Sequence, residues 1–221
     1  MNIEQARFNM IEQQIRPWDV LNLGVLELLA VVKREDFVPP AHRALAFVDT
    51  EVPLSSSTGG QQCMLAPKVE ARLLQELAVH KHERVLEIGA GSGYMAALLA
   101  HKAQQVTTLE IDPELAAFAT ANLRRAGATN VTVVQADGAA GLTGDGPFDV
   151  ILLSGSVAEV PQALLSQLKV GGRLAAIVGS APVMRAVLIT RTGDQGLERR
   201  VLFDTVAQRL SGFPEPTRFH F

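Results

Sequence analysis

A short glycine-rich loop constrains the fold of this chain more than any other feature. Gly89, Gly91 and Gly93 occupy alternate positions between an apolar segment at residues 85–88 and a predicted helix that begins at Tyr94. Glycines at such a strand-to-helix turn allow a tight bend and let a ligand approach the backbone closely. The dinucleotide fingerprint G-x-G-x-x-G/A would need a small residue where Tyr94 stands. The loop therefore predicts an α/β fold with a ligand site, and it disfavours a nicotinamide-dependent oxidoreductase.

The chain from Arg84 onward alternates between apolar strands and helices. Such alternation predicts a doubly wound, Rossmann-like sheet, mostly parallel and covered on both faces. The turn at residues 193–196 predicts an antiparallel hairpin of the last two strands. Helices are expected at residues 94–102, 113–126 and 160–168. The expected strands are residues 85–88, 105–111, 130–135, 148–153, 173–178, 184–192 and 201–206.

The chain divides at a polar connector that ends near residue 67. Residues 1–67 predict an N-terminal helical cap followed by a loop rich in serine and glycine, and this part has no strand–helix alternation of its own. Loops of this length without secondary structure are often functional. Residues 68–221 carry the α/β pattern. We expect the two parts to form one structural unit.

Composition excludes several classes of partner and site. Of 221 residues, 20 are Lys or Arg and 23 are Asp or Glu, which gives a net charge of −3 and no basic excess for nucleic acid. Cys63 is the one cysteine, so neither a disulfide framework nor a cysteine zinc cage is expected. No metal site is predicted, because His80 and His82 lack a third ligand at suitable spacing. No signal peptide or membrane span is visible in the sequence, and we expect a cytoplasmic protein.

Three acidic residues stand at the ends of successive predicted strands. Glu87, two positions before the first glycine, suits a ligand with a cationic amino group. Glu110 ends the second strand, where a carboxylate accepts hydrogen bonds from ribose hydroxyls, although a solvated acid at a strand end is also common. Asp137 follows the third strand and suits an adenine amine, although Asp137-Gly138 is also an ordinary turn pair. Together the three positions predict a nucleoside ligand.

This order of motifs resembles the class I S-adenosylmethionine-dependent methyltransferases. The loop at residues 168–174 is also similar to the family's loop before its fifth strand. The resemblance implies a seven-stranded sheet with an antiparallel last strand, a methyltransferase domain at residues 68–221, and S-adenosyl-L-homocysteine as product. The cofactor contacts that it implies are Glu87, Ile88, Gly89, Ala90, Gly91, Ser92, Gly93, Tyr94, Glu110, Ile111, Asp137, Gly138, Ser154, Met64 and Leu65.

The N-terminal part narrows the resemblance to the protein-L-isoaspartate O-methyltransferases. Residues 9–16, 32–39, 46–49 and 52–54 are similar to segments of that family, so the similarity extends over nearly the whole chain. The resemblance implies protein repair, in which a carboxylate of an isoaspartyl residue in a damaged protein is methylated. A carboxylate acceptor is already ionised at neutral pH, so no strong general base is expected.

The substrate loop departs from the family pattern, which reads Gly-x-Thr-Ile-Ser-Gln-Pro. Alignment on Pro67 places Leu65 at the position of the hydroxyl residue and Ala66 at that of the glutamine. Ser57 and Thr58 are the candidate replacements for the catalytic hydroxyl. Two alternatives follow from this departure. The first is a methyltransferase of the same scaffold that acts on another acceptor, a small molecule included, and the second is a non-catalytic S-adenosylmethionine-binding protein.

Overall fold

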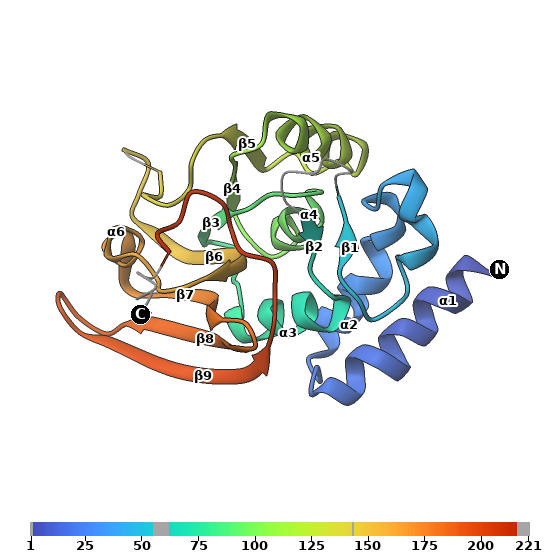
Figure 1. Ribbon diagram of the computed structural model, residues 1–221, viewed down its shortest axis with the longest axis horizontal. Helices are drawn as coiled ribbons and strands as arrows, with labels where there is room; N and C mark the ends of the chain where they lie inside the picture. The colour runs from blue at the N-terminus through green and yellow to red at the C-terminus, as the bar shows by residue number, and fades with distance from the viewer. Residues whose placement is uncertain (1, 55–61, 143, 216–221) are drawn as a thin grey trace, which may run out of the picture.

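The computed structural model describes residues 2–54, 62–142 and 144–215 and is built around one large sheet (Figure 1). The strands lie in the order β5-β4-β3-β6-β7-β8-β9. A separate small sheet pairs β1 (Val52–Pro53) with β2 (Cys63–Met64). The strands of the large sheet are β3 (Arg84–Ile88), β4 (Gln105–Glu110), β5 (Val131–Gln135), β6 (Phe148–Val157), β7 (Leu168–Ser180), β8 (Val183–Arg191) and β9 (Leu197–Thr205).

The direction of the strands confirms the predicted fold class. The neighbouring pairs from β5 to β7 are all parallel. β8 runs against β7, and the last strand β9 pairs antiparallel with β8, as the predicted hairpin requires. Since β8 is antiparallel to both of its neighbours, β9 points in the same direction as β7. The strand that runs opposite to the rest of the large sheet is therefore β8.

Sequence-encoded caps start several of the helices. Asn2 and Asn22 accept hydrogen bonds from backbone amides in the first turns of α1 and α2, and Asp112 does so for α5, which has Pro113 in its first turn. Such caps satisfy amides that have no partner inside the helix. A π-helical turn, Ile11–Ile15, continues from α1. The helices are α1 (Ile3–Met10), α2 (Leu23–Val31), α3 (Pro67–Leu77), α4 (Tyr94–Ala100), α5 (Pro113–Arg125) and α6 (Gln162–Leu165).

The helix expected at residues 160–168 is shorter in the structure. Only α6, four residues long, is helical there. Leu168 pairs with Phe148 and already belongs to β7, so the chain must leave the helix before it. The apolar residues that suggested one longer helix are therefore divided between α6 and the start of β7.

Alternate residues of the central strands enter two different hydrophobic clusters. Val85, Val150 and Leu152 belong to the first cluster, and Leu86 and Ile151 to the second. Successive side chains of a strand point to opposite faces, so the two clusters mark the two covered faces of the sheet. The first cluster contains side chains of α2, α3 and α4, and the second contains those of α6.

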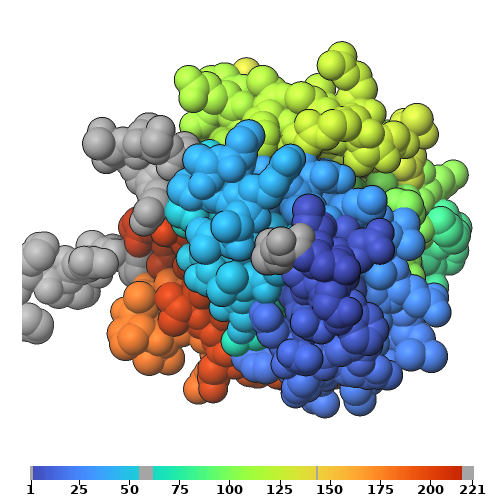
Figure 2. All heavy atoms as spheres, turned by 90° about the vertical axis from the view of Figure 1, so that its right-hand side faces the viewer, coloured from blue at the N-terminus to red at the C-terminus, as the bar shows by residue number. Residues whose placement is uncertain are grey.

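The N-terminal segment packs on the main sheet through the first of these clusters. Met10, Ile15 and Leu29 share that cluster with Val85 and Ala175 of the sheet. Figure 2 shows this segment, in blue, covering one face of the molecule between α5 in yellow-green and the C-terminal strands. The boundary near residue 67 thus crosses a continuous core, and the division itself stays a prediction. Within the described residues, the structure has no helix that is both long and apolar enough to span a membrane.

Candidate functional site

A cleft at the carboxyl ends of the strands lies where the chain order of the sheet reverses. From β3 the chain proceeds to β4 and β5 on one side, whereas β6 returns to the other side of β3. The carboxyl ends of strands at such a switch point are where doubly wound sheets bind ligands. The cleft encloses about 630 Å³, including the part open to solvent. Its walls include Leu54, Gln62, Cys63, Leu65, Ile88, Gly89, Gly91, Leu109, Glu110, Ile111, Gly138, Ser154, Gly155, Gln208, Arg209, Leu210 and Phe213.

The glycine loop forms the floor of this cleft. The amides of Gly89 and Ala90 both donate to the carbonyl oxygen of Leu109, at 2.9 and 3.1 Å, which holds the loop against β4. Gly91 has φ +52°, and a Cβ atom there would lie 3.0 Å from Cδ1 of Leu54. A side chain at Gly91 would therefore be strained and would fill the space beside the cleft.

Gly93 has a packing role, and its predicted contact with a ligand stays a prediction. It has φ +82° and precedes α4, and a Cβ atom there would lie 3.2 Å from the carbonyl oxygen of Ala119 in α5. The residue allows α4 and α5 to approach each other, and it is not part of the cleft wall.

Glu110 joins the glycine loop to the end of β4. Its Oε2 accepts a hydrogen bond from the amide of Gly91 at 2.8 Å, and its Oε1 accepts one from the amide of Asp112 at 3.1 Å. The carboxylate lines the cleft, and the residue is 5% exposed. Each carboxylate oxygen has two lone pairs, so both oxygens keep one for a ligand. This arrangement suits a pair of vicinal hydroxyl groups such as those of a ribose.

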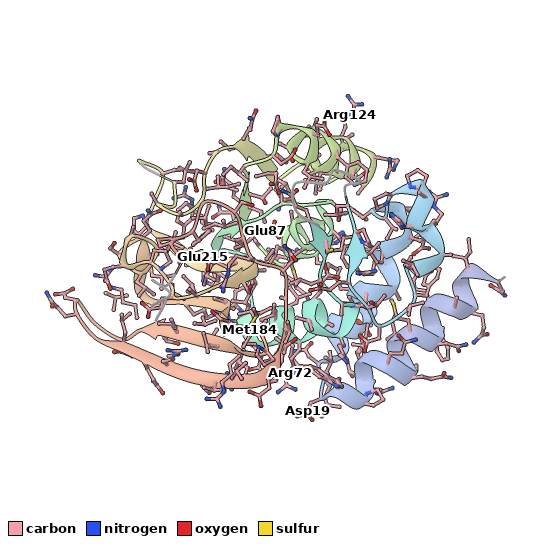
Figure 3. All side chains as sticks on the ribbon, in the orientation of Figure 1. Asp19, Arg72, Glu87, Arg124, Met184 and Glu215 are labelled. Carbon is pink, nitrogen blue, oxygen red and sulfur yellow. The ribbon has the colours of Figure 1, made fainter. Side chains whose placement is uncertain are left out.

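Glu87 lies in the interior, at the centre of the molecule (Figure 3). Thr108 Oγ1 and Ser154 Oγ each donate to its carboxylate at 2.7 Å. Burial raises the pKa of Glu87 to about 7, and the charges of Glu70 and Glu110 act in the same direction. Among the ion pairs of the described residues, none includes Glu87. A buried carboxylate with two hydroxyl donors and no cation is suited to receive a positively charged ligand group.

The third predicted acid lies at the outer rim of the site. The side chain of Asp137 is exposed, and its Oδ1 accepts a hydrogen bond from the amide of Ala139 at 2.9 Å. The neighbouring Gly138 lines the cleft and is closely packed, because a Cβ atom there would lie 2.3 Å from Cγ2 of Ile88. Asp137 thus stands beside the cleft, in a turn, and its contact with a ligand stays a prediction.

Residues 207–213, here called the C-terminal strap, close one side of the cleft. The amide of Ser156 donates to the carbonyl oxygen of Gln208 at 2.8 Å, and the amide of Leu210 donates to the carbonyl oxygen of Ser156 at 2.9 Å. Figure 1 shows this part of the chain, in red, returning from β9 across the sheet. A Cβ atom on Gly89 would lie 2.8 Å from Cδ2 of Leu210, so the strap touches the glycine loop. No motif in the sequence indicated this wall.

The predicted site residues fall into three groups. Those in the cleft wall are Ile88, Gly89, Gly91, Glu110, Ile111, Gly138, Ser154 and Leu65. Those around a smaller cavity beside it are Glu87, Ala90, Ser92, Tyr94 and Met64. Gly93 and Asp137 line neither. The candidate catalytic residues Ser57 and Thr58 lie outside the described residues.

The substrate-loop residue aligned with the family's hydroxyl is part of the cleft. Leu65 is 5% exposed and lines the cleft with an apolar side chain, while its carbonyl oxygen accepts a hydrogen bond from Arg34 at 2.7 Å.

Within the described ranges, no three His, Cys, Asp or Glu side chains are grouped so that they could hold a metal ion.

The sequence of this chain matches one family of known proteins along most of its length. Residues 6–207 match the model of the family described as protein-L-isoaspartate(D-aspartate) O-methyltransferase. The protein-L-isoaspartate O-methyltransferase of Koribacter versatilis is 38% identical over 198 residues, which are 90% of this chain and 87% of that protein. The one from Rhodopseudomonas palustris is 38% identical over 213 residues, 94% of this chain and 96% of that protein.

Solved structures show the same fold. One described as a protein-L-isoaspartate O-methyltransferase has a TM-score of 0.80 at 25% identity; the match covers 93% of this chain and 66% of that chain. A Plasmodium falciparum protein assigned to the same class, solved with S-adenosyl-L-homocysteine, has a TM-score of 0.77 at 21% identity and covers 92% of this chain and 98% of that chain. Because these matches cover more than nine tenths of this chain, the sheet and the N-terminal segment are both parts of the shared fold.

Proposed function

Because the chain belongs to the protein-L-isoaspartate(D-aspartate) O-methyltransferase family, we propose that it methylates the free carboxylate of isoaspartyl residues in protein or peptide acceptors. The methyl donor of this family is S-adenosylmethionine. Similarity along nearly the whole chain favours this acceptor over a different one and over a non-catalytic role.

The single observation that carries the donor-binding part of the proposal is the position of Glu110. Its carboxylate is tied to the glycine loop and to the end of β4, and it faces the cleft at the switch point. We propose that it accepts hydrogen bonds from the ribose hydroxyls of the donor. The glycine loop then receives the amino-acid end, with the carboxylate of Glu87 opposite its ammonium group. Asp137 and Gly138 stand on the adenine side.

The donor supplies an activated methyl group on a sulfonium centre when it is bound. An isoaspartyl carboxylate is ionised at neutral pH and is a competent nucleophile without a general base. The protein must therefore align the acceptor and keep water out, which are effects of position and desolvation. The C-terminal strap and Leu54 of the cap wall the cleft and are suited to exclude water. We propose Ser57 and Thr58 as the residues that orient the acceptor carboxylate.

A transfer assay with methyl-labelled donor tests the proposal. A peptide that contains one isoaspartyl residue is compared with the same peptide carrying a normal aspartyl residue. We expect label in a base-labile ester on the isoaspartyl peptide only. Label on neither peptide, from a protein that still binds S-adenosyl-L-homocysteine, would contradict the proposed acceptor. A protein that fails to bind S-adenosyl-L-homocysteine would contradict the proposed activity altogether.

A further inference from the structure

A second buried acid lies near Glu87 and belongs to a different element. Glu70 is in α3 and is 4% exposed, on the side of the helix that also buries Leu73 and Leu74. Its ion pair is with Arg34, whose Nε lies 3.2 Å from Oε2 of Glu70. Arg34 is itself fully buried and also donates to the carbonyl oxygens of Ala46 and Leu65. Burying a carboxylate is costly, so its location calls for a reason.

Glu70 and Glu87 line the same small cavity. The volume open to the centre of a water-sized group is about 20 Å³ in this cavity, against about 70 Å³ in the cleft on the same measure. The wall of the cavity also includes Tyr94, Ser92 and Met95. It shares Gly89, Gly91 and Ser154 with the cleft at the strand ends, so it lies directly beside the floor of that cleft. A space of roughly this size holds a single small polar group.

The cavity has an acceptor without a partner. Tyr94 is 1% exposed, and within the described part of the chain its hydroxyl oxygen has no hydrogen bond. An unpaired buried hydroxyl destabilises the fold unless a ligand or water satisfies it. The guanidinium of Arg34 lies over the ring of this tyrosine, 5.8 Å from its centroid.

The charges around the cavity do not balance. Glu70 and Glu87 are two carboxyl groups, and Arg34 is the one cation paired with either of them in the described residues. The nearby Arg7 and Glu35 neutralise each other. Burial raises the pKa of both cavity acids to about 7, as expected for acids that lack a full complement of cations. One further positive charge would complete the cluster.

We propose that Glu70 and the Tyr94 hydroxyl join Glu87 in binding the ammonium group of the donor's amino-acid end. The inference rests on the proposed function. An ammonium group has three N–H donors, and this wall offers two carboxylates and one hydroxyl oxygen as acceptors. The site would select adenosyl ligands that carry a primary amine. Glu70 would bind the ligand and would also hold Arg34, which positions the backbone of Leu65 at the cleft.

Binding calorimetry with two ligands tests this assignment. S-adenosyl-L-homocysteine carries the amino-acid end, and 5′-methylthioadenosine lacks it. We expect Glu70→Gln to weaken binding of the first ligand by roughly 10-fold or more, the usual effect of losing a charged hydrogen bond, and to change binding of the second by less than about twofold. The matched control is Glu83→Gln, because Glu83 is a buried acid paired with Arg173 outside both cavities.

Tyr94→Phe gives a second test that does not depend on the ion pair. It removes a hydroxyl that has no hydrogen-bond partner among the described residues, so the fold should lose no stability. We expect binding of S-adenosyl-L-homocysteine to weaken by roughly 2–10-fold, with 5′-methylthioadenosine unaffected. Equal weakening of both ligands by either variant, or no weakening of the first, would overturn the assignment of the cavity. Failure of the wild-type protein to bind S-adenosyl-L-homocysteine would refute the proposed function instead.

Discussion

The affinity of this protein for S-adenosyl-L-homocysteine should depend on pH through Glu87. Burial raises the pKa of Glu87 to about 7 in the free protein, with Glu70 and Glu110 as the neighbouring acids and Ser154 and Thr108 as hydrogen-bond donors. An ammonium group of the ligand favours the ionised carboxylate. Binding therefore has to remove a proton from any Glu87 that is neutral, and affinity must fall as the pH falls.

The size of the effect follows from the fraction of Glu87 that is ionised. With a pKa of about 7, roughly three quarters of the carboxyl groups are ionised at about pH 7.5 and roughly 3% at about pH 5.5. The dissociation constant should therefore rise by roughly 25-fold over this interval if only the ionised form binds the ammonium group. Glu70, whose pKa is also raised to about 7, would add to this slope.

Calorimetric titrations at both pH values measure the change directly. The pH profile of Glu87→Gln should be flatter, with weak binding at both values, and any slope that remains belongs to Glu70. Binding of 5′-methylthioadenosine should change little with pH, because this ligand has no ammonium group. Equal affinity of the wild-type protein for S-adenosyl-L-homocysteine at the two pH values would refute the reasoning.

Three further outcomes are expected. Glu110→Ala should weaken S-adenosyl-L-homocysteine binding by roughly 30-fold or more in calorimetry, since two charged hydrogen bonds to ribose are lost, whereas Glu114→Ala in the exposed first turn of α5 should not. Arg34→Leu should lower the free energy of unfolding in urea by about 3–5 kcal/mol, because a buried acid loses its cation; Arg185→Ala, which breaks an exposed pair, should cost less than about 1 kcal/mol. Glu70 and Glu87 have pKa values raised to about 7, so each stabilises the fold fully below its unfolded pKa, and this contribution is lost as the pH rises through 7. The melting temperature of the ligand-free protein should therefore be lower at about pH 8 than at about pH 6.

The sheet and the glycine loop could be predicted because their signals are local. An apolar strand, three spaced glycines and the first residue of a helix occur within residues 85–94, and the structure places Gly89 and Gly91 in the cleft wall. The position of Glu110 at the cleft could be predicted for the same reason, since this residue ends a strand next to that loop. The packing role of Gly93 could not be predicted in this way, because its close neighbour Ala119 comes from a different helix.

The C-terminal strap and Glu70 could not be predicted in the same way. The strap becomes a wall only because Ser156 pairs with Gln208 and Leu210, which is a contact between distant parts of the chain. Glu70 had one local signal, an acid on the apolar side of a helix, but its partner Arg34 lies in another segment and no short spacing joins them. Side chains that meet through tertiary packing leave no pattern in a single sequence.

A structure of the protein with bound S-adenosyl-L-homocysteine tests the central claim most directly. The account predicts both ribose hydroxyls within hydrogen-bond distance of the Glu110 carboxylate, with the amino-acid end over the glycine loop and the adenine beside Gly138. A nucleoside bound elsewhere, or one in this cleft whose ribose does not contact Glu110, would contradict it.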